Sequence, residues 1–143
     1  ASPVARAWET AELAGLGRAA EACEAVVEWD YGQYVGRPSD DIRAEAPGWN
    51  LFADGAPGGE SPGDVIARLE PVLARLRAAP GPVAVVSHGH LLRALIAGWL
   101  ELPLEHAGRL VVDPASITVL GRHRAIPSLL LLNDRNHLVG IDA

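Results

Sequence analysis

The chain has 143 residues, 49% of them apolar, and a formal net charge of −6. We therefore expect one domain over residues 1–143 with its own core. The acidic charge argues against a surface for nucleic acid or for anionic membranes, and no apolar run approaches the roughly 20 residues of a membrane-spanning helix. Cys23 is the single cysteine, which favours a reducing, cytoplasmic location. All 12 basic residues are arginine, a bias typical of a GC-rich, bacterial genome.

The first predicted element is a helix that starts at Ser2-Pro3 and stops at Gly15. Ser2 is expected at its N-cap and Pro3 at its first helical position. Arg6 lies one turn in, where its planar guanidinium can reach back over the helix N-terminus toward a bound anion. The alternative is an arginine on a solvated helix face.

A short apolar strand is predicted over residues 22–27, and a loop rich in aromatic residues follows over residues 28–36. Trp29 and Tyr31 are expected to wall a substrate pocket. Beside Trp29, the carboxyl group of Glu28 could be desolvated enough to hold a proton near neutral pH, as a general acid requires. Alternatively, Glu28 caps a helix or pairs with an arginine.

Ser39-Asp40-Asp41 is predicted to open a short helix that Pro47-Gly48 ends. Residues 47–61 are rich in glycine and long for a structureless loop, which is typical of a lid or a binding loop. Ser61 then caps a helix whose apolar positions form a core-facing stripe, and Pro71 is expected to kink this helix.

The central pattern is the apolar run of residues 83–86, which predicts a buried strand, followed by Ser87-His88-Gly89 and a helix that runs to about Leu100. A strand that turns through glycine into a helix brings a side chain and free backbone N–H groups to one sheet edge, where anions are favoured. His88 is therefore interpreted as a phosphate or carboxylate ligand. The alternative is a polar edge residue that caps the next helix.

Three further strands are predicted at residues 110–112, 117–120 and 129–132, and the last two are expected to pair as a hairpin at a sheet edge. Residues 133–137 are polar and are expected to be loose. Because helices alternate with strands, the predicted fold class is α/β, a three-layer α/β/α sandwich with a mostly parallel sheet.

Four motifs carry a family resemblance: Ser2-Pro3-x-x-Arg6-Ala7-x-x-Thr10-Ala11, Glu28-Trp29-Asp30-Tyr31-Gly32-x-Tyr34-x-Gly36, Gly58-Gly59-Glu60-Ser61 and Ser87-His88-Gly89-x-x-x-Arg93. In this order and spacing the chain resembles the histidine phosphatase superfamily, with its phosphoglycerate mutase-like fold. Within that superfamily it resembles the small bacterial acid phosphatase-like members. The resemblance covers nearly the whole chain.

The resemblance implies a role for each motif. Arg6 matches an arginine that clamps the phosphate, and Glu28 matches the acidic residue that protonates the leaving oxygen and later activates water. His88 matches a histidine that hydrogen-bonds the transferring phosphoryl group, with the Gly89 amide nearby. Ser61 and the glycines before it match a loop that is more structural than catalytic.

In the family, a second histidine in an Arg-His-Gly turn is the nucleophile and becomes phosphohistidine. This turn does not occur among the 143 residues. We therefore expect the sequence to be the larger part of a longer protein, whose N-terminal segment carries the nucleophile and the central strand. The sheet would then show unpaired backbone and an open apolar cleft. The lack of an initiator Met agrees with this expectation.

The function implied is hydrolysis of phosphomonoesters through phosphohistidine, with a small phosphorylated substrate or inorganic phosphate as the ligand. A mutase of the phosphoglycerate type is the enzymatic alternative. A non-catalytic remnant that binds phosphate or a partner's strand is the alternative of another class. No metal or other cofactor is expected, since His88 and His90 have no further ligand at suitable spacing. A homodimer is left open.

Overall fold

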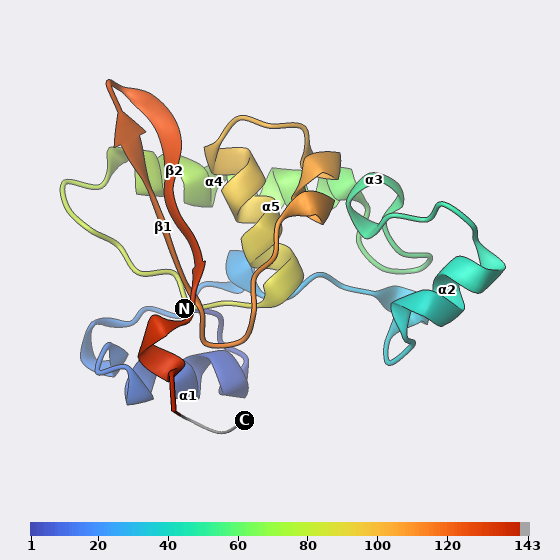
Figure 1. Ribbon diagram of the computed structural model, residues 1–143, viewed down its shortest axis with the longest axis horizontal. Coiled ribbons are helices and arrows are strands. Elements are labelled where there is room, and N and C mark those ends of the chain that lie inside the picture. Colours follow the sequence, from blue (N-terminus) through green and yellow to red (C-terminus); the bar gives the residue numbers. More distant parts are fainter. Residues whose placement is uncertain (141–143) are drawn as a thin grey trace.

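Figure 1 shows the computed structural model of the chain, which describes residues 1–140. Its α-helices are α1 (Ala5–Leu13), α2 (Ser39–Glu45), α3 (Leu51–Asp54), α4 (Pro62–Ala78) and α5 (Gly89–Trp99). Its strands are β1 (Ile117–His123) and β2 (Ile126–Asp134). Short 3₁₀ turns are η1 (Gly17–Ala19), η2 (Glu24–Val26), η3 (Gly32–Tyr34), η4 (Leu104–Arg109) and η5 (Asn136–Leu138).

The four longer helices form where the sequence predicts them. α4 begins at a reciprocal capping box, in which the Asp64 amide donates to the Ser61 hydroxyl and the Ser61 amide donates to the Asp64 carboxylate. The helix continues through Pro71. The start of α1 differs from the prediction, because Val4 is its N-cap and Ser2 lies before it. The hydroxyl of Ser2 is engaged elsewhere, as described below, so its predicted capping role is wrong.

The sheet is the main departure from the prediction. Among the described residues it has two antiparallel strands, β1 and β2, with Val119 opposite Leu131. The predicted hairpin is therefore confirmed. The three-layer α/β/α sandwich with a mostly parallel sheet is not formed by these 140 residues.

The remaining predicted strands are wrong as strands. Residues 24–26 form the turn η2, and residues 83–86 and 110–112 have no regular secondary structure. A strand needs a neighbouring backbone with which to form a ladder. Within the described part of the chain, the run 83–86 receives one backbone bond, from the Ser2 amide to the Val86 carbonyl at 2.9 Å.

The first two residues lie between two extended segments. The Ala1 amino group donates to the Glu21 carbonyl at 2.8 Å, and the Cys23 amide donates to the Ala1 carbonyl at 2.9 Å. Together with the Ser2–Val86 bond, these contacts place the first two residues between the segments around residues 21–23 and 86. The hydrogen bonds are too few for these segments to be strands.

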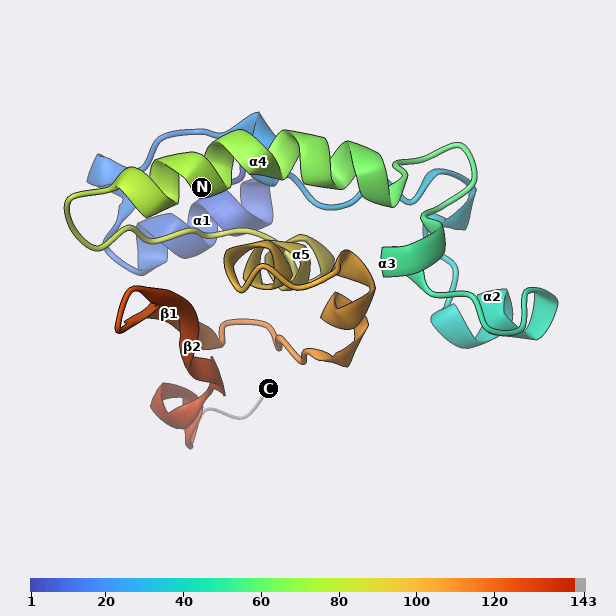
Figure 2. The same ribbon diagram turned by 90° about the horizontal axis from the view of Figure 1, so that it is seen from above.

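The core lies around α4, α5 and the loop that carries Trp29. Seen from above, α1 and α4 lie on one side of α5, and the β1–β2 hairpin lies on the other (Figure 2). The buried cluster consists of Val26, Trp29, Leu51, Phe52, Ala56, Val65, Leu69, Leu73, Leu91, Ala94, Leu95, Ala97, Trp99 and Ala107. Five members of this cluster come from α5, so the helix is buried on several sides. This burial agrees with its apolar character around most of its circumference.

Two polar segments are more ordered than the sequence suggests. Residues 47–61 contain α3, where the Asn50 side chain accepts a bond from the Phe52 amide and Phe52 enters the core. Residues 133–137 were expected to be loose, but β2 runs to Asp134 and η5 follows it. No helix in the described part of the chain is long and apolar enough to cross a membrane.

Candidate active site

His88 is buried at the start of α5, with 6% of its surface exposed. Its side chain does not cap the helix; instead, its Nε2 lies 2.9 Å from the Ser2 hydroxyl oxygen. His88 is thus the N-cap residue of α5, as the alternative had it, but its side chain makes no capping bond. Burial, and after it the positive charge of Arg6, lower the pKa of His88, while the charge of Glu28 opposes this shift. The neutral imidazole is favoured near pH 7.

Ser2 is a site residue that sequence reasoning missed. It is fully buried, its hydroxyl accepts a bond from the Val4 amide at 3.3 Å, and the same hydroxyl meets His88. Because a Ser-Pro pair is common at a helix start, the contact of Ser2 with His88 was not predicted. The available signal was that Ser2 and His88 both belong to the motifs of the family resemblance.

Arg6 lies in the first turn of α1 with an exposed side chain. Its positive charge acts on the pKa of both His88 and Tyr31 and lowers both. Among the described residues, its side chain makes no hydrogen bond or ion pair. The guanidinium is therefore free to bind an anion.

The Glu28 carboxylate sits at the N-terminus of α5. One carboxylate oxygen accepts bonds from the amides of Trp29 and Leu91, both at 3.0 Å, and the other accepts from the His90 amide at 3.4 Å. Backbone amides at a helix N-terminus favour a negative charge. The alternative in which Glu28 caps a helix is thus realised, and it brings the carboxylate next to His88.

Tyr31 and His90 form a second polar pair beside Glu28. The Tyr31 hydroxyl lies 2.7 Å from Nδ1 of His90, and the two rings meet edge to face with centroids 5.6 Å apart. Burial, and after it the charge of Glu28, raise the pKa of Tyr31 above its ordinary value. Tyr31 therefore stays a hydroxyl, and its ring is half-buried; that it walls a substrate pocket stays a prediction.

Trp29 lies in the core, whereas Gly89 lies at the surface. Trp29 is 2% exposed, meets Phe52 edge to face, and donates its indole N–H to the Glu60 carbonyl at 3.0 Å. It supports the loop from within the core, and Tyr31 lies closer to the surface. Gly89 is exposed at the first position of α5, and its amide has no partner among the described residues.

The backbone that carries Glu28 is held by Arg68 from α4. The Arg68 guanidinium binds both carboxylate oxygens of Glu60, at 2.6 and 2.8 Å. It also donates to the carbonyls of Ala25, Val27 and Glu28, at 2.8, 2.9 and 3.4 Å. These bonds from one planar guanidinium fix the loop in place. No sequence signal had pointed to Arg68.

The same loop crosses residues 57–59 at two glycines. A Cβ atom on Gly32, whose φ is +47°, would lie 2.3 Å from the Gly59 amide nitrogen, and one on Gly59 would lie 2.2 Å from the Asp30 carbonyl oxygen. Only glycine permits so close an approach of two backbones. This finding agrees with the structural role expected for the glycines before Ser61.

A metal site has no support in the described residues, since no three His, Cys, Asp or Glu side chains there come close enough to share an ion. The positive charges of the site come from arginines. Arg6 is exposed, whereas Arg93 donates to the carbonyls of Ala107 and Gly108 and stacks over Phe52, so its guanidinium is largely occupied.

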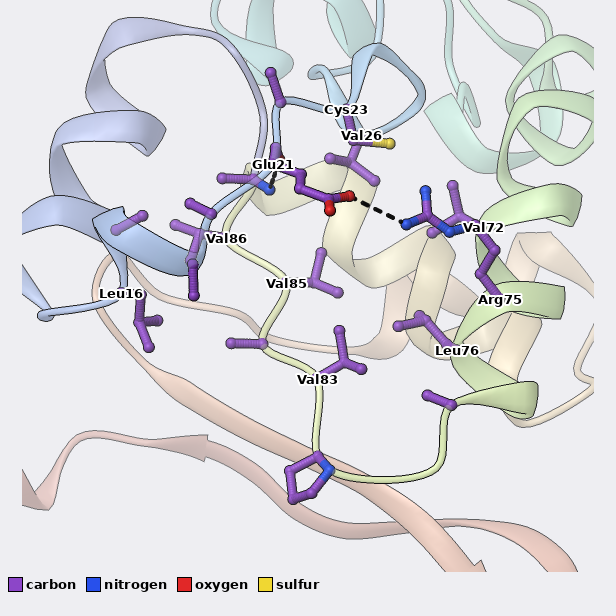
Figure 3. A pocket seen from close by; sticks show the side chains of 18 residues that line it. Leu16, Glu21, Cys23, Val26, Val72, Arg75, Leu76, Val83, Val85 and Val86 are labelled. Atoms are coloured by element: carbon purple, nitrogen blue, oxygen red, sulfur yellow. Dashed lines mark hydrogen bonds and ion pairs between the residues drawn. The ribbon is translucent and has the colours of Figure 1, made fainter.

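Apolar hollows border the extended run that ends at His88. One cavity of about 690 Å³ is lined by Leu16, Leu76 and Val83, among others, and Figure 3 shows this run passing between Leu16 and Leu76. A second cavity of about 560 Å³ lies between the run and β1. Val83 is 57% exposed, and the Ser116 hydroxyl on the wall of the second cavity is buried without a partner among residues 1–140.

Comparisons with known proteins point to one family. Residues 1–135 match the family described as the histidine phosphatase superfamily (branch 1). The chain is similar to an acid phosphatase of Mycobacterium tuberculosis, 37% identical over 138 residues that cover 95% of this chain and 68% of the relative. It is also similar to a glucosyl-3-phosphoglycerate phosphatase of Mycobacterium tuberculosis, 36% identical over 120 residues that cover 72% of this chain and 54% of the relative.

Solved structures show the same fold. The structure of an open reading frame product from Mycobacterium tuberculosis matches with a TM-score of 0.87 and 37% identity, over 92% of this chain and 69% of that one. A mycobacterial glucosyl-3-phosphoglycerate phosphatase in complex with inorganic phosphate matches with a TM-score of 0.73 and 33% identity, over 93% of this chain and 74% of that one. The chain thus spans only part of the length of each relative.

Proposed function

Since the chain belongs to the histidine phosphatase superfamily (branch 1), we propose that it forms the greater part of a phosphomonoester hydrolase that works through a phosphohistidine. One observation carries the proposal: the Glu28 carboxylate accepts bonds from the amides of His90 and Leu91, immediately after the buried His88. Two residues far apart in the sequence thus meet at the start of α5, and the positive charge of Arg6 acts on the pKa of His88. The relatives named as phosphatases support the reaction class.

The transferring phosphoryl group carries negative charge on three equatorial oxygens, so catalysis depends on positioned positive charge and N–H donors. We assign these roles to the free guanidinium of Arg6, to the imidazole of His88 and to the open amide of Gly89. The neutral His88 of the free protein takes up a proton when a phosphate dianion arrives, because an adjacent negative charge favours the imidazolium.

Glu28 is assigned the proton transfers. In the first step a histidine nitrogen attacks phosphorus, the bond to the leaving oxygen breaks, and the Glu28 carboxyl group gives that oxygen its proton. In the second step the Glu28 carboxylate takes a proton from water, the water oxygen bonds to phosphorus, and the phosphorus–nitrogen bond breaks. Inorganic phosphate and the free histidine result.

The nucleophile is assigned to a segment outside these 143 residues. The sequence has no Arg-His-Gly turn, and the cavity between the run 83–86 and β1 has the apolar lining that an inserted strand requires. A strand there would pair with the backbone of residues 83–86, where only the Val86 carbonyl has a backbone partner among the described residues, and would deliver its last residue beside His88. It would also create the mostly parallel sheet of the predicted α/β/α sandwich.

The second candidate is a non-catalytic protein of the same fold that binds phosphate at Arg6 and His88, and a partner's strand in the cavity beside β1. Within the described residues, Val83 is exposed and the Ser116 hydroxyl has no partner. Both observations favour a cavity that is open to a partner's strand when these residues are alone. Phosphoryl transfer of the mutase type is the nearer enzymatic alternative. A cytoplasmic, bacterial setting remains our proposal from composition and from the free Cys23.

The test uses the full protein and His88→Ala, with His123→Ala as the control, since His123 is exposed on β1. We expect turnover of p-nitrophenyl phosphate and an acid-labile, radiolabelled phosphoenzyme, with turnover falling by about 100-fold or more in His88→Ala and staying unchanged in the control. Phosphate binding without turnover would favour the non-catalytic candidate. Equal activity of the two variants would remove His88 from the site.

A further inference from the structure

The hydrogen bond between Tyr31 and His90 is not explained by the roles assigned so far. It joins the loop that follows Glu28 to the first turn of α5, across 59 positions of sequence. His90 is enclosed on its other side by the ring of Phe52, 5.6 Å away, over which the Arg93 guanidinium stacks. The pair is therefore built into the wall of the site and does not project into solvent.

The Tyr31 hydroxyl has one proton and lies 2.7 Å from Nδ1 of His90, whose backbone amide donates to the Glu28 carboxylate at 3.4 Å. The charge of Glu28 also acts on the pKa of Tyr31. Burial lowers the pKa of His90, against the charge of Glu28 and with that of Arg93. The imidazole is therefore neutral near pH 7, and its Nδ1 can donate or accept according to which ring nitrogen holds the proton. The titratable and charged groups that face the pair are Glu28, Arg6 and Arg93.

We propose that Tyr31 and His90 are positioning residues for Glu28, in which His90 fixes the direction of the Tyr31 O–H bond and Tyr31 supports the Glu28 carboxylate. This inference rests on the proposed role of Glu28. An Nδ1–H of His90 donates to the Tyr31 oxygen and turns the hydroxyl proton toward Glu28, which stabilises the carboxylate formed when the leaving oxygen has taken its proton. No proton leaves Tyr31 in this arrangement.

Tyr31 therefore matters most where the leaving group needs a proton. Alkyl phosphates leave as poor alkoxides, while p-nitrophenyl phosphate needs little protonation. Because a hydrogen bond to a charged group is among the stronger ones in proteins, Tyr31→Phe should lower kcat/KM on an alkyl phosphate about 10-fold more than on p-nitrophenyl phosphate. Losing a donor to the carboxylate should also move the basic limb of the pH–rate profile to higher pH.

The control is Tyr34→Phe, three residues away in the same loop, where the ring packs edge to face on Trp49 and lies outside the pair. Removing the hydroxyl there should change neither the substrate ratio nor the pH profile. His90→Leu should reproduce Tyr31→Phe, and the double variant should be no worse than either, since the two residues act as one unit. His90→Asn, which keeps a polar atom near the place of Nδ1, should restore part of the loss.

The experiment measures kcat/KM of the full protein on both substrates between pH 5 and 9. Glu28→Gln is the reference, since it must lose more on the alkyl phosphate. If Glu28→Gln loses equally on both substrates, the proposed function of Glu28 is wrong. If Glu28→Gln discriminates but Tyr31→Phe loses equally on both, or matches Tyr34→Phe, the positioning role is wrong and the function of Glu28 stands.

Discussion

Replacing Arg68 with Met should destabilise the protein through the loop that carries Glu28. The change keeps an apolar stem of similar length but removes the donors to the Glu60 carboxylate and to three backbone carbonyls. The Glu60 carboxylate would keep its bond from the Asp30 amide at 2.9 Å but lose its counter-charge. The loop would then be held by its core contacts, by the α5 amides and by its remaining hydrogen bonds, such as that from the Trp29 indole to the Glu60 carbonyl.

The magnitude lies between two limits. Breaking a fully buried ion pair costs about 3–5 kcal/mol, and breaking an exposed pair costs about 0–1 kcal/mol. Since the two side chains are 20% and 21% exposed, we expect about 2–3 kcal/mol. For a domain of this size, 1 kcal/mol moves Tm by about 3–4 °C, so Tm should fall by about 6–12 °C in a thermal melt followed by circular dichroism.

Arg75→Met is the matched control on the same helix. Arg75 meets Glu21 at 3.4 Å, and the two side chains are 75% and 82% exposed, so the cost should stay below about 0.5 kcal/mol. Similar Tm shifts for the two variants would refute the argument that Arg68 holds the loop. A Tm unchanged by Arg68→Met would do so as well.

Two further outcomes follow from the crossing at Gly32 and from the buried histidines. Gly32→Ala should cost at least about 1–2 kcal/mol in urea unfolding, because its φ is positive and its Cβ would strike the Gly59 backbone; Gly36→Ala, with positive φ but open space around it, should cost less. Burial lowers the pKa of both His88 and His90 in the folded state, so below about pH 6.5 the unfolded chain binds more protons. The free energy of unfolding should therefore fall as pH drops through that range, and His88→Gln should flatten the fall; an unchanged slope would contradict it.

The sequence predicts those elements of the fold that depend on residues close together in the chain. The capping box at Ser61 sets the start of α4, and the apolar runs of 117–120 and 129–132 pair because a turn joins them directly. The run 83–86 has the same apolar character, yet it makes no strand. Its side chains favour a sheet, but a ladder also requires a neighbouring backbone, and the described residues provide only Ser2.

The site contacts that sequence reasoning missed are those that join distant positions. Ser2 and His88 are 86 residues apart, and Tyr31 and His90 are 59 apart. No periodicity or cap signal records such a contact. The family resemblance brought Arg6, Glu28 and His88 into one hypothesis. Of these, the structure places Glu28 beside the start of α5, through its bonds from the α5 amides, and His88 at that start, in contact with Ser2.

With the proposed roles, the start of α5 would serve both an acid and an anion. The amides of His90 and Leu91 are occupied by the Glu28 carboxylate, whereas the Gly89 amide, one residue earlier, is left without a partner among the described residues. A phosphate bound to Gly89, His88 and Arg6 would therefore lie directly beside Glu28. A proton donor has to be within hydrogen-bonding distance of the leaving oxygen. If the Gly89 amide binds the phosphate while the next two amides bind the Glu28 carboxylate, the carboxylate and the phosphate are held at about that distance without a deep pocket. The hold of Arg68 on the Glu28 carbonyl then matters for chemistry, because a shift of about 1 Å in a catalytic group is enough to cost rate.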